Sequence, residues 1–109
     1  MARMRNSNGD DSFCFYKILF DPEIEELRIP SDFVKHITEQ ATEIAFLVGP
    51  CGKYWNIELK SNEGGMFIHG GWKNFRMEQH FEGGELLLFN YDGKMTFHVR
   101  VFDKNGLER

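Results

Sequence analysis

The polar segment Lys60-Ser61-Asn62 is the part of this sequence whose side chains are best suited to contact a nucleic acid. An ammonium group and a hydroxyl group can donate hydrogen bonds to phosphate oxygens, and an asparagine amide can pair with the edge of an adenine. Glu63 follows directly, and its carboxylate can accept from cytosine N4 or repel a phosphate. A solvated hairpin tip has the same residue types, so these side chains alone do not define a function.

The sequence lacks the residue spacings that metal binding and the common catalytic motifs need. The histidines His36, His69, His80 and His98 are far apart and have no ligand spacing with each other or with a cysteine, so we expect no metal site. The acidic segment 21–26 lacks the ligand spacing of a calcium loop. No nucleophile elbow, phosphate-binding glycine loop or paired-carboxylate motif is present, and we therefore expect neither an enzyme with a small-molecule substrate nor a cofactor.

The composition is that of one small globular domain. The chain has 109 residues, 41% hydrophobic and 28% charged, and its 11 phenylalanines bring the aromatic content to 15%. Aromatic residues and alternating runs favour a β-rich fold with a ring-filled core. The formal charge of −4 opposes binding to nucleic acid through the overall field, so such binding needs a local basic patch. No apolar run approaches the ~20 residues that cross a bilayer, and we expect no membrane contact.

The two ends of the chain and its two cysteines give little indication of function. Residues 1–12 lack the apolar core of a secretory signal, and we expect a disordered leader there, with a polar tail at 104–109. Cys14 and Cys51 have no spacing motif, which favours reduced thiols and an intracellular compartment over a disulfide framework.

A predicted hairpin positions the Lys60-Ser61-Asn62 segment. Trp55, Ile57 and Leu59 alternate with polar residues, a pattern typical of a strand with one buried face. The glycine-containing pentad 61–65 predicts the hairpin loop, and 66–69 the return strand.

The remaining elements follow from alternation and from turn residues. Further strands are predicted at 13–20, 27–29, 43–48, 85–91 and 94–103, and short helices at 31–37 and 71–79. In the first strand, apolar residues on both sides predict that both faces are covered, and Asp92-Gly93 predicts a two-residue hairpin. Ile44, Phe46 and Val48 recur at period 2 in the third strand. Seven strands with mostly antiparallel connections favour a closed or half-closed barrel.

Six fragments in order carry a family resemblance. They are Phe13-x-Phe15-x-Lys17-x-Leu19, Leu27-Arg28-Ile29-Pro30-x-x-Phe33, Gly52-Lys53-x-Trp55-x-Ile57-x-Leu59, Phe67-x-x-Gly70-Gly71-Trp72-x-x-Phe75, Glu85-x-Leu87-x-Phe89-x-Tyr91-x-Gly93 and Phe97-x-Val99-x-Val101-Phe102. Together they resemble the plant B3 DNA-binding domain, more closely its reproductive-meristem branch, over residues 13–103. The resemblance implies an all-β, seven-stranded open barrel (the B3 pseudobarrel) with two short α-helices, in a nuclear transcription regulator.

The resemblance also implies how double-stranded DNA would be bound. Members of the family grip the major groove with two arms, which correspond here to residues 20–26 and 60–65. The DNA-binding residues predicted in and around these arms are Lys17, Arg28, Lys53, Lys60, Ser61, Asn62 and Lys73. We expect binding that is weak or of low sequence specificity in the isolated domain.

The first arm departs from the basic character expected of the family. It holds Asp21, Glu23, Glu25 and Glu26 and no basic residue, and these carboxylates oppose the counterion release that supplies most non-specific affinity for DNA. The alternative is therefore a B3-fold protein-interaction module, in a dimer or a multi-domain regulator, whose acidic arm binds a basic partner.

Overall fold

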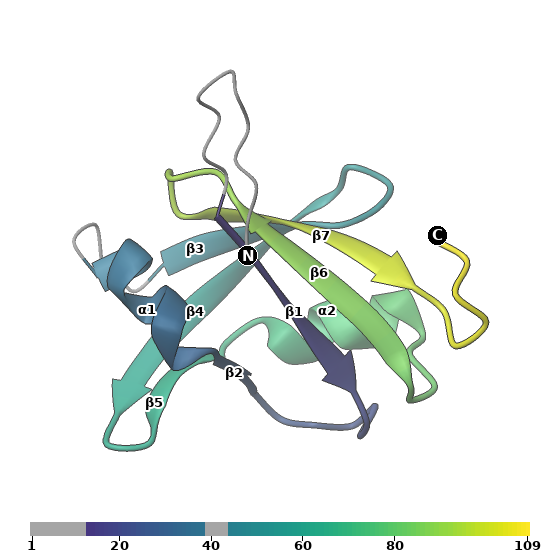
Figure 1. Ribbon diagram of the computed structural model, residues 1–109, viewed down its shortest axis with the longest axis horizontal. Helices are drawn as coiled ribbons and strands as arrows, with labels where there is room; N and C mark the ends of the chain where they lie inside the picture. The colour runs from purple at the N-terminus through teal and green to yellow at the C-terminus, as the bar shows by residue number, and fades with distance from the viewer. Residues whose placement is uncertain (1–12, 39–43) are drawn as a thin grey trace.

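The computed structural model describes residues 13–38 and 44–109 (Figure 1). The predicted leader at 1–12 lies outside the described residues. The elements, in chain order, are β1 (Phe13–Leu19), β2 (Leu27–Ile29), α1 (Ser31–Thr38), β3 (Ile44–Val48), β4 (Tyr54–Asn62), β5 (Gly65–Ile68), α2 (Trp72–Gln79), β6 (Glu85–Tyr91) and β7 (Thr96–Phe102). No helix in this part of the chain is long and apolar enough to span a bilayer.

The seven strands form one curled sheet in the order β1-β6-β7-β3-β4-β5-β2 (Figure 1). All neighbours are antiparallel except β3 and β7, which are parallel. The edge strands β1 and β2 are not hydrogen-bonded to each other, so the barrel stays open between them. The predicted open barrel with two short helices is confirmed.

Aromatic rings fill the barrel. Phe15 of β1 stacks on Phe89 of β6 with ring centroids 4.8 Å apart, and Phe33 of α1 meets Phe15 edge-on at the same distance. Near the other helix, Trp55 and Phe75 meet edge-on at 4.9 Å. Such pairs add to the stability gained from burial alone. The ring-filled core that the composition predicts includes five buried aromatic residues, Trp55, Trp72, Phe75, Phe89 and Phe97.

The outer face of β1 is exposed, and the prediction that both faces of this strand are covered is wrong. Tyr16, Ile18 and Phe20 are 66%, 49% and 82% exposed. Both helices turn their apolar residues into the barrel, Phe33 from α1 against Phe15 and Trp72 and Phe75 from α2 into the core. Within the described residues, neither helix is therefore free to cover the outside of β1.

The β4–β5 turn is tighter than the predicted five-residue loop. Both strands continue until Asn62 pairs with Gly65, so only Glu63 and Gly64 form the turn. Asn62 Oδ1 accepts the Gly64 N–H at 2.7 Å, and Gly65 has a φ of 127°, which favours glycine. The arm is therefore a strand-paired ribbon almost to its end.

Two further strand details differ from the sequence pattern. The β6–β7 loop spans four residues, 92–95, instead of two, because the Asp92 side chain accepts the Lys94 N–H and Met95 adopts a left-handed φ of 57°. In β3, Ala45 and Leu47 face the core, while the period-2 residues Ile44 and Phe46 are 50% and 36% exposed.

Candidate nucleic-acid interface

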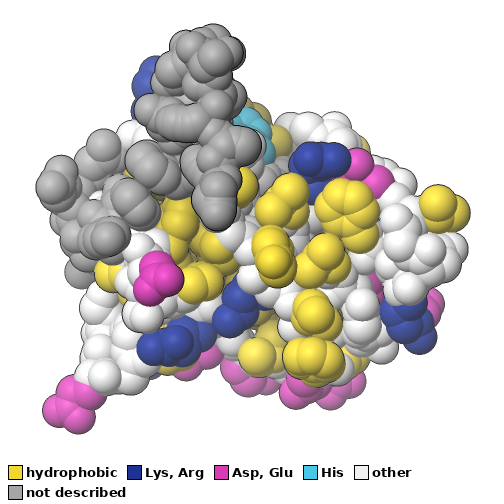
Figure 2. Space-filling view, viewed as in Figure 1, with side chains coloured by type: hydrophobic (Ala, Val, Ile, Leu, Met, Phe, Trp, Pro, Cys, Tyr) yellow, Lys and Arg dark blue, Asp and Glu magenta, His cyan; other side chains and the backbone are white. Residues whose placement is uncertain are grey.

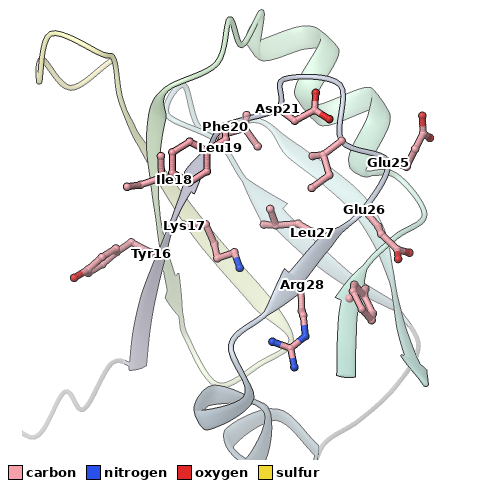
Figure 3. A pocket seen from close by; sticks show the side chains of 12 residues that line it. Tyr16, Lys17, Ile18, Leu19, Phe20, Asp21, Glu25, Glu26, Leu27 and Arg28 are labelled. Carbon is pink, nitrogen blue, oxygen red and sulfur yellow. The ribbon is translucent and has the colours of Figure 1, made fainter. Parts of the chain in front are cut away.

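The opening between β1 and β2 forms a groove of about 820 Å³ (Figure 3). Its apolar lining includes Leu19, Leu27 and Phe67, together with Ile24 of the first arm. In Figure 1, the loop between β1 and β2 and the turn between β4 and β5 project along the lower edge of the molecule, on either side of β2. The two predicted arms therefore extend from the same side of the barrel.

Two positive charges face each other across this groove. Figure 3 shows Lys17 from β1 and Arg28 from β2 pointing into it. Burial, and secondarily the charge of Arg28, lowers the pKa of Lys17 below its usual value. In the part of the chain that the structure describes, neither residue forms an ion pair with the carboxylates of the first arm.

A third positive charge lies on the same face of the sheet as Arg28. Phe67 of β5 pairs with Arg28 of β2 on one side and with Lys60 of β4 on the other, so these three residues form one cross-strand row. Residues opposite one another in neighbouring strands point to the same face. The structure thus brings Lys60 and Arg28 together on the face that carries the second arm.

The second arm is held by a residue of β2. Arg28 Nε donates to the carbonyl oxygen of Gly64 at 2.9 Å, and a Cβ on Gly65 would lie 3.0 Å from the same Nε atom. The guanidinium therefore packs against the turn and restrains its position. Asn62 Oδ1 is engaged within the turn, which leaves the Asn62 amide group to donate outward.

The first arm is held by α2. The carbonyl oxygen of Ile24 accepts hydrogen bonds from Trp72 Nε1 and from Arg76 Nε, each at 3.1 Å. Glu26 Oε1 lies 3.0 Å from His69 Nδ1, which links the end of the arm to the residue after β5. These contacts join residues more than 40 positions apart, and no local sequence pattern indicated them.

The carboxylates of the first arm remain at the surface. Asp21, Glu23 and Glu25 are exposed, and Asp21 Oδ1 accepts the Glu23 N–H at 2.9 Å. In Figure 2, acidic side chains gather along the lower edge of the molecule, below the basic residues. Asp21, Glu25 and Glu26 also line the groove, so a phosphate there is attracted by Lys17 and Arg28 and repelled by these carboxylates.

Two of the predicted site residues are not brought to the groove. Lys53 precedes β4, at the opposite end of that strand from the turn, and its Nζ is 2.7 Å from Glu78 Oε1 of α2. Lys73 is exposed in the first turn of α2 and does not line the groove. Lys60, Ser61 and Asn62 are all exposed near the turn, as predicted.

The described residues contain no group of three or more His, Cys, Asp or Glu side chains that could hold a metal ion. Cys14 and Cys51 are both exposed and free. The histidines that lie near carboxylates do so in pairs, His69 with Glu26 and His98 with Asp92.

An open seven-stranded barrel with two arms beside a groove lined by both basic and acidic side chains defines a domain of the pseudobarrel class. A model of the B3 DNA binding domain matches residues 15–105, and the chain belongs to that family. It is 37% identical over 98 residues to the putative B3 domain-containing protein Os04g0347400 of Oryza sativa subsp. japonica, covering 87% of this chain and 23% of that protein. It is 36% identical over 93 residues to the B3 domain-containing protein REM20 of Arabidopsis thaliana, covering 84% and 32%.

Solved structures agree with this assignment. The hypothetical Arabidopsis thaliana protein At1g16640.1 superposes with a TM-score of 0.74 at 26% identity, over 88% of this chain and 95% of that chain. The N-terminal domain of Helicobacter pylori LlaJI.R1 gives a TM-score of 0.60 at 13% identity, covering 86% of each chain, which shows a shared fold. The chain spans about a quarter to a third of the length of the two curated relatives named above.

Proposed function

We propose that this domain docks in the major groove of double-stranded DNA through its two arms, with the second arm making the principal contacts. The observation that carries the proposal is the row of Arg28 and Lys60 beside the second arm, with Lys17 lining the same groove as Arg28. The family relationship supports DNA as the partner. By the same relationship, we propose that the domain acts in the nucleus within a plant transcription regulator.

Each basic residue has a distinct role in this proposal. Lys17 and Arg28 line the groove and bind a phosphate group between them, which relieves their mutual repulsion. Lys60 and Ser61 donate to phosphate oxygens beside the turn, and the Asn62 amide group donates to a base edge. Lys53 and Lys73 contribute at most long-range attraction, because they lie outside the groove.

The acidic first arm makes the affinity of the isolated domain low. Its exposed carboxylates offset much of the gain from three lysine and arginine contacts, and the net charge of −4 adds no attraction from a distance. The arms are nevertheless held in place before DNA arrives, by the bonds to Ile24 and Gly64, which lowers the ordering cost of binding. Weak binding by a preorganised surface is the expected behaviour.

Titration of short duplexes at low and at moderate salt tests this proposal. We expect binding at low salt that falls as salt rises, and Lys60→Ala should weaken it across sequences and reduce the salt slope by about 1. An Asn62→Ala change should instead alter preference at one base pair. Absence of binding at low salt would contradict the proposal.

A second candidate function follows from the exposed carboxylates of the first arm. Asp21, Glu23 and Glu25 have no ion-pair partner among the described residues, so they are free to meet a basic partner protein. A lysine-rich peptide serves as the probe. Binding that survives Lys60→Ala but is lost when Glu23, Glu25 and Glu26 become glutamine would favour this candidate over DNA recognition.

A further inference from the structure

The strand ladders place apolar side chains in rows on the outside of the barrel. Ile18 of β1 is opposite Leu86 of β6, which is opposite Phe102 of β7. In the next row, Tyr16 is opposite Leu88. Phe20 extends the stripe just beyond the end of β1. We call these residues the outer face, which consists of Tyr16, Ile18, Phe20, Leu86, Leu88 and Phe102.

This outer face is open to solvent over a contiguous area. Its three β1-side residues are between 49% and 82% exposed, and its three other members are half-buried. Figure 2 shows hydrophobic side chains gathered over β1 and its neighbours, on the right half of the view. Apolar patches of this kind on small soluble domains mark interaction surfaces.

We propose that the outer face is a dimer interface, which packs against the same face of a second copy of this chain across a two-fold axis. The proposal goes beyond DNA binding and does not depend on it. Two observations select a second copy as the occupant: the electrical neutrality of the face, and the area that two such faces bury together.

The outer face carries no net charge with which a partner of opposite charge could pair. The one charged side chain in its rows, Arg100 beside Leu88, is neutralised by Glu108 through two hydrogen bonds of 2.8 Å. The strand's own cation, Lys17, points to the opposite side of β1. The rest of the chain has an excess of acidic residues and repels a second copy, so a neutral apolar face is where two copies can approach.

The area is sufficient for a reversible dimer. Exposed aromatic side chains offer about 150–250 Å² each, so the six residues present on the order of 500 Å² per copy. Two copies together bury about 1,000 Å², which is the lower limit for a specific interface. A symmetric dimer of this size is weak and depends on protein concentration.

The outer face borders the groove, because Tyr16, Ile18 and Phe20 also line it. Figure 3 shows Tyr16 and Ile18 extending from one side of β1 and Lys17 from the other, as expected for successive side chains on a strand.

The test measures the mass of the whole chain by sedimentation from micromolar to near-millimolar concentration. We expect the wild type to pass from monomer to dimer, and Ile18→Lys to weaken the association about tenfold or more, because Ile18 lies between Tyr16 and Phe20 at the middle of the face. Met77→Lys is the matched control, since Met77 on α2 is a comparably exposed apolar residue, at 56%, outside the outer face. It should associate as the wild type does.

A charge-pair experiment identifies the second copy as the occupant. Ile18→Lys and Ile18→Glu should each remain monomeric, and an equimolar mixture of the two should form a dimer, because Ile18 lies nearest the two-fold axis. Far-ultraviolet circular dichroism checks that both variants are folded. A wild type that stays monomeric at every concentration, or a mixture that does not associate, would overturn the proposal.

Discussion

Arg28 Nε lies 2.9 Å from the carbonyl oxygen of Gly64, so a residue that follows the first arm fixes the turn of the second. Arg28 also lines the groove opposite Lys17. One side chain therefore links the groove to the ribbon proposed to enter DNA. Loss of this link should change the position of the second arm even when no DNA is present.

Replacing Arg28 should loosen the second arm in the free protein. A hydrogen bond of this kind contributes about 1 kcal/mol, so Arg28→Ala should speed amide hydrogen exchange of the 61–66 ribbon roughly fivefold. Lys60→Ala is the control, because Lys60 is in the same cross-strand row but makes no hydrogen bond to the turn. Equal exchange rates in the two variants would show that Arg28 does not hold the arm.

Replacing Trp72 should destabilise the first arm. In Trp72→Phe, the Ile24 carbonyl loses one of its two donors, which costs about 1 kcal/mol beyond the loss of packing. Trp55→Phe is a matched control, because Trp55 Nε1 is buried and has no hydrogen-bond partner in the described structure. Chemical denaturation of both variants measures the difference. A larger loss of stability in Trp55→Phe than in Trp72→Phe would contradict the role of the indole hydrogen bond.

Lys17 should lower the stability of the free domain and strengthen its binding to DNA. Burial and the charge of Arg28 lower its pKa, so the folded state holds this proton less tightly than the unfolded chain. The charged lysine therefore destabilises the fold at neutral pH, and this penalty fades as pH rises through the lowered pKa towards the ordinary value of 10.5.

Lys17→Met should accordingly raise the melting temperature at pH 7, and the advantage over the wild type should shrink at alkaline pH. The same variant should bind duplex DNA more weakly. Lys60→Met is the control, since Lys60 is exposed and its replacement should weaken binding with a stability change within about 0.5 kcal/mol. A Lys17→Met variant that is less stable than the wild type at pH 7 would refute the argument.

The turn into α2 should tolerate no side chain at Gly71. This residue has a φ of 84°, and a Cβ added there would lie 2.1 Å from the carbonyl oxygen of Asn56. Gly71→Ala should therefore cost at least about 2 kcal/mol in the free energy of unfolding. Gly93→Ala is the control. Gly93 has a similar φ of 87°, but an added Cβ there would have no atom within 4 Å, so this variant measures the cost of the backbone conformation alone. Equal losses in both variants would exclude the steric contribution.

The order of the elements could be predicted from the sequence because local alternation encodes it. Trp55, Ile57 and Leu59 face the core as their spacing requires, and β6 is a strand at the predicted residues 85–91. The polar residues at the second turn were also identified correctly as exposed. These features depend on neighbours in sequence, which is why the pattern carries them.

The contacts that hold the arms could not be predicted, because they join distant parts of the chain. The partners of the Ile24 carbonyl are 48 and 52 residues away, and the partner of the Arg28 side chain is 36 residues away, so no local pattern indicates these contacts. The exposure of Tyr16 and Ile18 was missed for a related reason. Alternation shows which residues share a face, but whether another element covers that face depends on where the helices pack.

In the proposed complex, the groove side of this barrel binds DNA through Lys17, Arg28 and Lys60. The decisive measurement is a fluorescence-anisotropy titration of one labelled duplex at low and at moderate salt. It compares Lys60→Ala with Lys53→Ala, since Lys53 is paired with Glu78 at the far end of β4. We predict that the wild type and Lys53→Ala bind alike, while Lys60→Ala binds more weakly and with a shallower salt slope. Equal loss in both variants, or no binding by the wild type, would rule out this mode of binding.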